Sequence, residues 1–194
     1  MARTSGEKTR LALAESLRNQ IKKKPLDKIN ISDIVADCNL NRQTFYYHFQ
    51  DVYALIEWMY RYDGTEIFRK TSGTDDVFAT AREMLAYVDR HREELCAVTE
   101  SKAKIYFFNF LNECIGNCFN LIFDEISKDY KVSDKYRKFL QSFCTSSIVG
   151  VVDEWVKAPE SERASVDEMM KMFDYAFNGT LKLALSNYKA SSNK

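Results

Sequence analysis

Apolar positions in the first fifty residues recur with a helical period and predict two short helices. The first helix opens at Thr4, with Glu7 three positions later, and ends at the run KKKP, residues 22–25. Its apolar stripe is Leu11, Ala14, Leu17 and Ile21. The second helix covers residues 31–38, and its stripe is Ile31, Ile34, Val35 and Cys38. Asn30 and Asp33 have the spacing of a capping pair at its start.

A short turn joins the second helix to a third helix over residues 41–49. Asn39 tolerates a left-handed backbone, Leu40 is expected to fill the angle between the helices, and Asn41 is expected to cap the third helix. The connection therefore has the three to four residues that a helix-turn-helix motif requires. We predict that residues 1–50 form a three-helix domain of this kind.

The third helix, NRQTFYYHF, has an apolar face and an opposite face of unusual composition. Phe45 and Phe49 stack on one side, whereas Gln43 and Tyr47 point nearly opposite, with Arg42 in the first turn. A solvated helix would favour Lys and Glu, so this much exposed aromatic and amide surface indicates a binding partner. The layout is typical of a helix that lies on DNA, although a three-helix unit that serves protein contacts is the alternative.

The helix order and the segment INISDIVADCNLNRQTFYYHF, residues 29–49, resemble the N-terminal DNA-binding domain of TetR-family transcriptional regulators. In that family the second helix of the motif enters the major groove. The resemblance implies DNA contacts at the matching positions, and our candidate DNA-binding residues are Asn41, Arg42, Gln43, Thr44, Tyr46, Tyr47, His48 and Lys28. The family often has a phosphate-binding Lys at the start of the fourth helix, where this chain has Val52. Nearby substitutes for that lysine are Lys22, Lys23, Lys24 and Lys28.

Charge and composition agree with a DNA-binding N-terminal part. The whole chain is neutral, with 28 basic and 28 acidic residues, but residues 1–50 hold nine Lys or Arg against five Asp or Glu. Positive charge is therefore concentrated where phosphate would bind. Two Pro and six Gly in 194 residues favour an all-helical chain. We expect a cytoplasmic protein, since no signal peptide or membrane span is evident and five irregularly spaced Cys fit a reducing compartment.

Residues 51–194 are predicted to form a second, helical domain with regulatory and dimerisation roles. Asp51 is expected to cap its first helix, and the sequence TSGT at 71–74 to end that helix. The expected helices span residues 51–70, 75–89, 91–98, 102–127, 134–157 and 165–189. With the N-terminal domain, this makes an all-α fold of about nine helices.

The last two long helices carry apolar stripes that resemble the dimer-forming helix pair of the TetR family. In that family two subunits make a four-helix bundle. Our candidate dimer-interface residues are Val151, Trp155, Phe173 and Phe177. The alternative is that these stripes only fill the core of one subunit.

A small-molecule pocket is the second expectation for this domain. The run IYFFNFLNECIGNCFNLIF at 105–123 mixes aromatic and thiol side chains with three Asn, and apolar walls with a few polar groups suit a ligand. Candidate ligand-binding residues are Trp58, Tyr62, Phe107, Phe110, Cys114 and Phe143. Residue types alone favour the alternative, that these side chains are ordinary core.

Sequence patterns of catalysis or metal binding are weak. Cys114 and Cys118 lie one helical turn apart, but no second pair has ligand spacing. His48 belongs to the predicted DNA face, and His91 stands among charged residues at a helix start. There is no Gly-rich phosphate loop, GxSxG or HExxH motif. We therefore expect no enzymatic activity, no cofactor and no metal site.

The preferred interpretation is an effector-responsive repressor that binds a pseudo-palindromic operator as a homodimer. The segment KKKPLDKINISDIVADCNLNRQTFYYHFQDVYALIEWMY is similar to the subset of the TetR family that includes the activator of dihydroxyacetone kinase genes. That resemblance implies an alternative, an activator controlled by a protein coactivator. A ligand-binding protein or an enzyme with a vestigial motif is the third interpretation.

Overall fold

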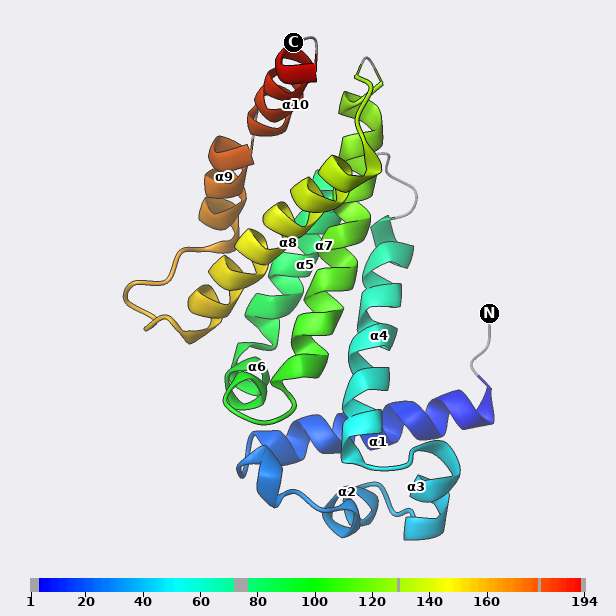
Figure 1. The fold of residues 1–194 in the computed structure, drawn as a ribbon. Coiled ribbons are helices and arrows are strands. Elements are labelled where there is room, and N and C mark those ends of the chain that lie inside the picture. Colours follow the sequence, from blue (N-terminus) through cyan, green and yellow to red (C-terminus); the bar gives the residue numbers. More distant parts are fainter. Residues whose placement is uncertain (1–3, 72–76, 129, 178, 193–194) are drawn as a thin grey trace. The chain divides into compact units, whose positions relative to one another are not determined.

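The computed structural model describes residues 4–71, 77–128, 130–177 and 179–192, and within these ranges the regular structure is helical, without strands (Figure 1). This confirms the predicted all-α fold. The elements are α1 (Ser5–Ile21), a 3-10 helix η1 (Leu26–Lys28), α2 (Ile31–Asp37), α3 (Arg42–His48), α4 (Val52–Thr71), α5 (Val77–Arg90), α6 (Arg92–Thr99), α7 (Lys104–Ile126), α8 (Asp134–Lys157), α9 (Val166–Phe177) and α10 (Thr180–Ser192).

The chain forms two compact units. The first comprises residues 1–66 and 91–110, and the second comprises residues 67–90 and 111–194. Most of α4, all of α6 and the start of α7 thus belong with the three N-terminal helices. The functional division at residue 50 stays a prediction, because it follows the helix-turn-helix motif alone.

In the first unit, α1 packs across both α2 and α3 (Figure 1). Leu13, Leu17, Ile34 and Phe45 are fully buried where these helices meet. The buried Ser16 hydroxyl donates a hydrogen bond to the Ile34 carbonyl at 2.9 Å, which satisfies a polar group inside the apolar contact. A second part of this core contains Tyr60 of α4, whose ring packs against Phe107 and Phe110 of α7.

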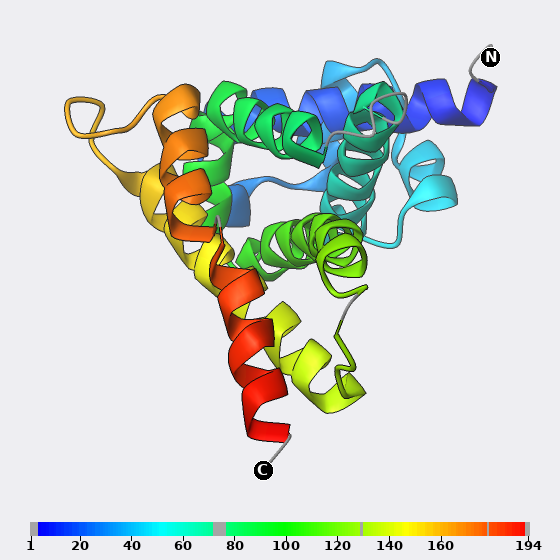
Figure 2. The same cartoon turned by 90° about the horizontal axis from the view of Figure 1, so that it is seen from above.

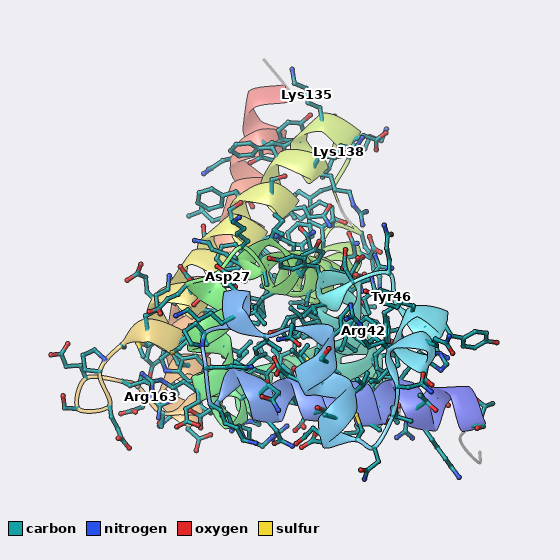
Figure 3. All side chains as sticks on the ribbon, turned by 90° about the horizontal axis from the view of Figure 1, so that it is seen from below. Asp27, Arg42, Tyr46, Lys135, Lys138 and Arg163 are labelled. Carbon is teal, nitrogen blue, oxygen red and sulfur yellow. The ribbon has the colours of Figure 1, made fainter. Side chains whose placement is uncertain are left out.

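In the second unit, α5 packs against α9, and α7, α8 and α10 share an apolar cluster. That cluster is Phe119, Phe123, Leu140, Cys144, Leu181 and Leu185. Two contacts hold the link between α8 and α9. The Trp155 Nε1 donates a hydrogen bond to the Ala164 carbonyl at 2.7 Å. Arg163 of the link forms an ion pair with Asp89 of α5 at 2.8 Å (Figure 3).

The predicted single helix over residues 165–189 is divided into α9 and α10, which follow one another along one side of this unit (Figure 2). Gly179 has φ +81° between them, in the left-handed region that ends a right-handed helix. The other boundaries agree with the sequence prediction to within about three residues, which is the usual uncertainty of helix ends. No helix in the described ranges is long and apolar enough to cross a membrane.

Candidate nucleic-acid interface

Local hydrogen bonds set the start of α2, the turn and the start of α3. Asn30 and Asp33 form the reciprocal capping box predicted from the sequence. Asn39 has φ +53°, so it adopts the left-handed conformation expected at the turn. The Asn41 side chain accepts a hydrogen bond from the Thr44 backbone N–H at 2.8 Å and caps α3. These contacts are all short-range, which explains why the sequence pattern was sufficient to predict them.

The two faces of α3 differ as the sequence predicts. Phe45 is fully buried, and Phe49 at the C-cap is buried beside it, with ring centroids 5.9 Å apart. Tyr46 is 51% exposed and Tyr47 is 84% exposed. The Arg42 guanidinium donates to the Tyr46 hydroxyl at 3.4 Å, so these two side chains lie together on the surface of α3 (Figure 3). The helix is therefore anchored by Phe45 and presents hydrogen-bonding aromatic groups to its surroundings.

The remaining candidate DNA-binding residues lie in different environments. Gln43 and Lys28 are exposed. Thr44 is half-buried, and its hydroxyl donates a hydrogen bond to the Asn41 side chain, which caps α3, at 3.1 Å. His48 is half-buried next to Tyr47, with ring centroids 5.0 Å apart, and its ring also lies close to Gly6 of α1. Of the eight, the exposed residues are Lys28, Asn41, Arg42, Gln43, Tyr46 and Tyr47.

Lys24, one of the candidate substitutes for the phosphate-binding lysine that is absent at Val52, forms an ion pair within the domain. Its ammonium group lies 2.6 Å from the Asp33 carboxylate, and this pair lowers the pKa of Asp33 from its ordinary value. Val52 itself is half-buried at the start of α4. Lys22, Lys23 and Lys28 are exposed and remain the candidates for a compensating phosphate contact.

The six candidate ligand-binding residues are not gathered around one described cavity. Trp58 and Tyr62 stack on each other at 5.2 Å, beside a recess of about 210 Å³ in the first unit. Phe107, Phe110 and Cys114 are buried, and the first two pack on Tyr60 as core. Phe143 is 55% exposed on α8. A role for these residues in ligand binding stays a prediction.

The four candidate dimer residues also differ in exposure. Val151 is 47% exposed on α8. Trp155 is buried, and its indole N–H donates a hydrogen bond to the Ala164 carbonyl of the same chain. Phe173 and Phe177 are half-buried and line an apolar cavity of the second unit. Other large apolar side chains exposed on the last two helices include Met172 and Tyr175 on α9 and Leu183 on α10.

Comparison with known proteins identifies the second half of the chain. Residues 75–179 match the family model of a TetR C-terminal domain, described as a transcriptional regulator C-terminal region. This match covers more than half of the sequence. The chain belongs to the TetR family of transcriptional regulators. The resemblance of residues 29–49 to the family's DNA-binding domain lies outside the matched region, so the two observations are independent.

Individual relatives agree with this family assignment. The transcriptional activator DhaS of the dhaKLM operon from Lactococcus lactis subsp. lactis (strain IL1403) is 23% identical over 153 residues, which is 75% of this chain and 78% of that protein. A solved structure of the dihydroxyacetone kinase operon activator DhaS superposes with a TM-score of 0.72 and 21% identity, covering 90% of this chain and 97% of the other. A TetR regulator from Streptococcus agalactiae 2603V gives a TM-score of 0.61 and 16% identity, covering 87% and 92%. At these identities the structural likeness establishes the TetR-like fold.

Proposed function

We propose that this TetR-family regulator binds a pseudo-palindromic DNA operator through the exposed face of α3. The observation that carries the proposal is the contrast between Phe45, fully buried, and Tyr47, 84% exposed two residues later. Tyr46 and Tyr47 are adjacent exposed aromatic side chains on a helix whose opposite face is buried, and a contiguous aromatic surface of this kind is typical of an interaction site. Tyr46, Arg42 and Gln43 supply donors and acceptors suited to base edges and phosphates.

Charge supports DNA as the partner. Residues 1–50 carry nine basic and five acidic side chains, whereas the chain as a whole is neutral. Lys22, Lys23 and Lys28 are exposed at the end of α1 and in η1. The positive charge is concentrated in the N-terminal residues, where it would attract the phosphate backbone of DNA. The regulator would act in the cytoplasm, where it meets DNA.

Two copies of the chain would read the operator. A recognition helix as short as α3 contacts only a few base pairs, so a two-fold dimer is needed to read two half-sites. The second unit offers a surface for such pairing, because consecutive helices α8, α9 and α10 expose large apolar side chains. These side chains are Val151, Met172, Tyr175 and Leu183. Contact with a second copy would remove this apolar surface from water.

Regulation would follow a shift between two conformers of the dimer, of which only one matches the operator. Repression that an effector relieves is the mode we propose first, as the default of the family. Activation is the second candidate, and the similarity to the transcriptional activator DhaS favours it. In that case control would come from a protein coactivator in place of a small molecule.

Selection from a random duplex library tests the DNA-binding proposal. The wild-type protein should enrich a two-fold symmetric sequence, and its affinity should fall steeply with salt. Tyr47→Ala should weaken binding to the selected duplex by about 1–3 kcal/mol, because Tyr47 would lie in the groove. Ile105→Ala is the matched control, since Ile105 is an exposed apolar side chain of the same unit on α7. Equal affinities of the two variants and wild type would contradict the assigned role of α3.

In vitro transcription from a promoter that carries the selected operator separates the two modes. Repression predicts fewer transcripts as the protein is added, and activation predicts more. A requirement for a second protein before transcription changes would favour the coactivator-controlled alternative.

A further inference from the structure

The start of α8 and the end of α10 form a row of stacked aromatic rings on the surface of the second unit. Tyr188 stacks on Tyr136, with ring centroids 4.3 Å apart and an angle of 9° between the rings. Tyr136 in turn stacks on Phe139 at 6.1 Å, and Phe139 stacks on Phe143 at 6.3 Å. Phe139 is 60% exposed and Phe143 is 55% exposed. A single exposed Phe is common on a protein surface, whereas two neighbours in a continuous row indicate an interaction surface.

Hydrogen bonds hold this row in place. The Tyr136 hydroxyl donates to the Ala184 carbonyl at 3.2 Å, and the Tyr188 hydroxyl donates to the Ser133 Oγ at 3.0 Å. These contacts join the start of α8 to α10, so the two tyrosines form a fixed base beside the exposed phenylalanines. A surface that is already ordered loses little conformational entropy when a partner covers it.

Positive charge borders the row. Residues 128–143 hold five Lys or Arg against two Asp or Glu, although the whole chain is neutral. Lys135 precedes Phe139 by one helical turn, so these two residues lie on the same face of α8. Lys135 and Lys138 are exposed and extend outward from the start of α8 (Figure 3). A complementary partner therefore carries carboxylates beside its apolar groups.

Two other cations of this stretch are neutralised within the unit. Arg137 pairs with Asp124 at 2.7 Å, and Lys128 pairs with Glu125. The outward positive charge of this stretch is thus concentrated in residues 131–138. A single strand of nucleic acid needs a longer basic groove that follows its backbone. A short acidic segment of a protein fits this area better.

A second copy of the chain is a poorer match. Two-fold pairing brings the same patch of both copies together. Lys135 and Lys138 would then approach lysines of the same patch, and like charges in an interface are costly. Val151, the α8 residue of the proposed dimer surface, lies about three turns further along the helix than Phe139.

We propose that the surface formed by Lys135, Lys138, Phe139 and Phe143 docks an acidic segment of another protein that also carries apolar side chains. The two rings contact the apolar side chains of the partner, and the lysines pair with its carboxylates. All four residues belong to the second unit, so the inference does not depend on operator binding by α3.

Fluorescence anisotropy with a synthetic acidic peptide tests the surface. The probe is an amphipathic helix with Leu at every third or fourth position and Glu at the other positions. It should bind the whole chain saturably, and more weakly as the salt concentration is raised. The same peptide with Lys in place of Glu should not bind. Absence of saturable binding of the acidic peptide, or equal binding of both peptides, overturns the proposal.

Substitutions on α8 locate the binding. Phe139→Ser should weaken binding of the acidic peptide about tenfold, because it removes an aromatic anchor. Lys135→Glu should also weaken binding and should reduce its salt dependence. The matched controls are Phe78→Ser and Lys171→Glu, since Phe78 is 54% exposed on α5 and Lys171 is exposed on α9 of the same unit. If Phe139→Ser does not fold, Phe143→Ser takes its place, and wild-type peptide affinity in a folded surface variant overturns the assignment.

Two other occupants would give different results. A second copy on this surface would make Phe139→Glu monomeric in light scattering while the wild type is a dimer, and that outcome overturns the proposal. Oligothymidylate whose binding is lost in Phe139→Ser but kept in Tyr47→Ala would make nucleic acid the occupant and would overturn it as well. We expect the wild-type mass for Phe139→Glu, and equal oligothymidylate binding by Phe139→Ser and the wild type.

Operator affinity is measured on the same preparations, so that the two proposals are judged separately. Phe139→Ser should keep the wild-type operator affinity, because Phe139 and α3 belong to different compact units. Peptide binding by a protein that selects no operator would keep the docking surface and reject the proposed function. Operator selection without peptide binding would reject the docking surface and keep the proposed function.

Discussion

Arg18 of α1 and Glu94 of α6 form a buried ion pair, with the guanidinium Nη1 2.6 Å from the carboxylate Oε2. Glu94 is 1% exposed and Arg18 is 8% exposed. The same guanidinium also pairs with Asp63 of α4 and lies 2.8 Å from the His91 Nδ1. One arginine therefore connects α1 of the helix-turn-helix with α4 and α6, all within the first compact unit.

Glu94→Gln should destabilise the protein, because it leaves the buried Arg18 with less compensating charge. Removing one partner of a buried pair typically costs about 3–5 kcal/mol, and the remaining Asp63 should place the effect near the lower end. Glu93→Gln is the control, since Glu93 is the exposed neighbour on α6. Urea unfolding measures the free energy of unfolding of both variants and of the wild type. Free energies of unfolding that agree within about 0.5 kcal/mol would show that the pair does not stabilise the fold.

Arg42→Ala should weaken operator binding and reveal which group Arg42 contacts. If the guanidinium binds a phosphate, affinity should fall evenly across operator variants and the salt slope should decrease by about 1. If it reads a base, the loss should be concentrated at one position of the operator. Arg61→Ala is the control, because Arg61 is exposed on α4 and pairs with Glu57. Unchanged affinity and salt slope for Arg42→Ala would exclude Arg42 from the interface.

Val151→Glu should dissociate the proposed dimer without unfolding the chain. Val151 is exposed in the single chain, so the fold tolerates a charge there, but two-fold pairing would bury that charge twice. Light scattering should give about 45 kDa for the wild type, twice the 22.6 kDa chain, and the monomer mass for the variant. Leu121→Glu, on α7, should remain dimeric. A wild-type monomer at micromolar concentration would remove the basis for the proposed interface.

Asn39→Gly and Asn39→Ala should differ in stability. At φ +53° a Cβ is strained, at about 1–2 kcal/mol for an ordinary residue, and Asn relieves part of this through local hydrogen bonding. We expect Asn39→Ala to be destabilised by about 1 kcal/mol and Asn39→Gly to be close to wild type. Thermal unfolding of the two variants and the wild type measures these differences in stability. An alanine variant as stable as the glycine variant would mean that the turn does not require the left-handed conformation.

Cys114 and Cys118 should resist alkylation by iodoacetamide at pH 8 in the folded protein. Burial raises their pKa values to about 12 and about 11, so less thiolate is present than in the unfolded chain. For Cys118 a rise of two pKa units lowers the thiolate fraction about a hundredfold, and shielding slows the reaction further. Mass spectrometry of native and urea-unfolded samples measures each rate. The native rate should increase with pH through pH 10. Equal rates in the two samples would contradict the burial of these thiols.

The sequence was sufficient for the caps and for the helices other than the one expected over residues 165–189, which is divided near Gly179, because the determinants of caps and helix periods lie within about four residues of each other. Asn30 with Asp33, Asn41 with Thr44, and the period that separates Phe45 from Tyr47 are all contacts of one helical turn. The same information predicted the exposed side of α3, since burial of one face of a helix exposes the other.

The roles of the apolar residues from α4 onward depended on residues far apart in the chain, which local periodicity does not relate. Phe107 and Phe110 became core because Tyr60 of another helix packs on them, and Trp155 turned inward to donate to Ala164. Met84 and Phe173 meet across an apolar cavity although 89 positions separate them. Which apolar stripe fills a core, lines a cavity or faces a partner is decided by which helices pack together, and that choice is made only in the tertiary structure.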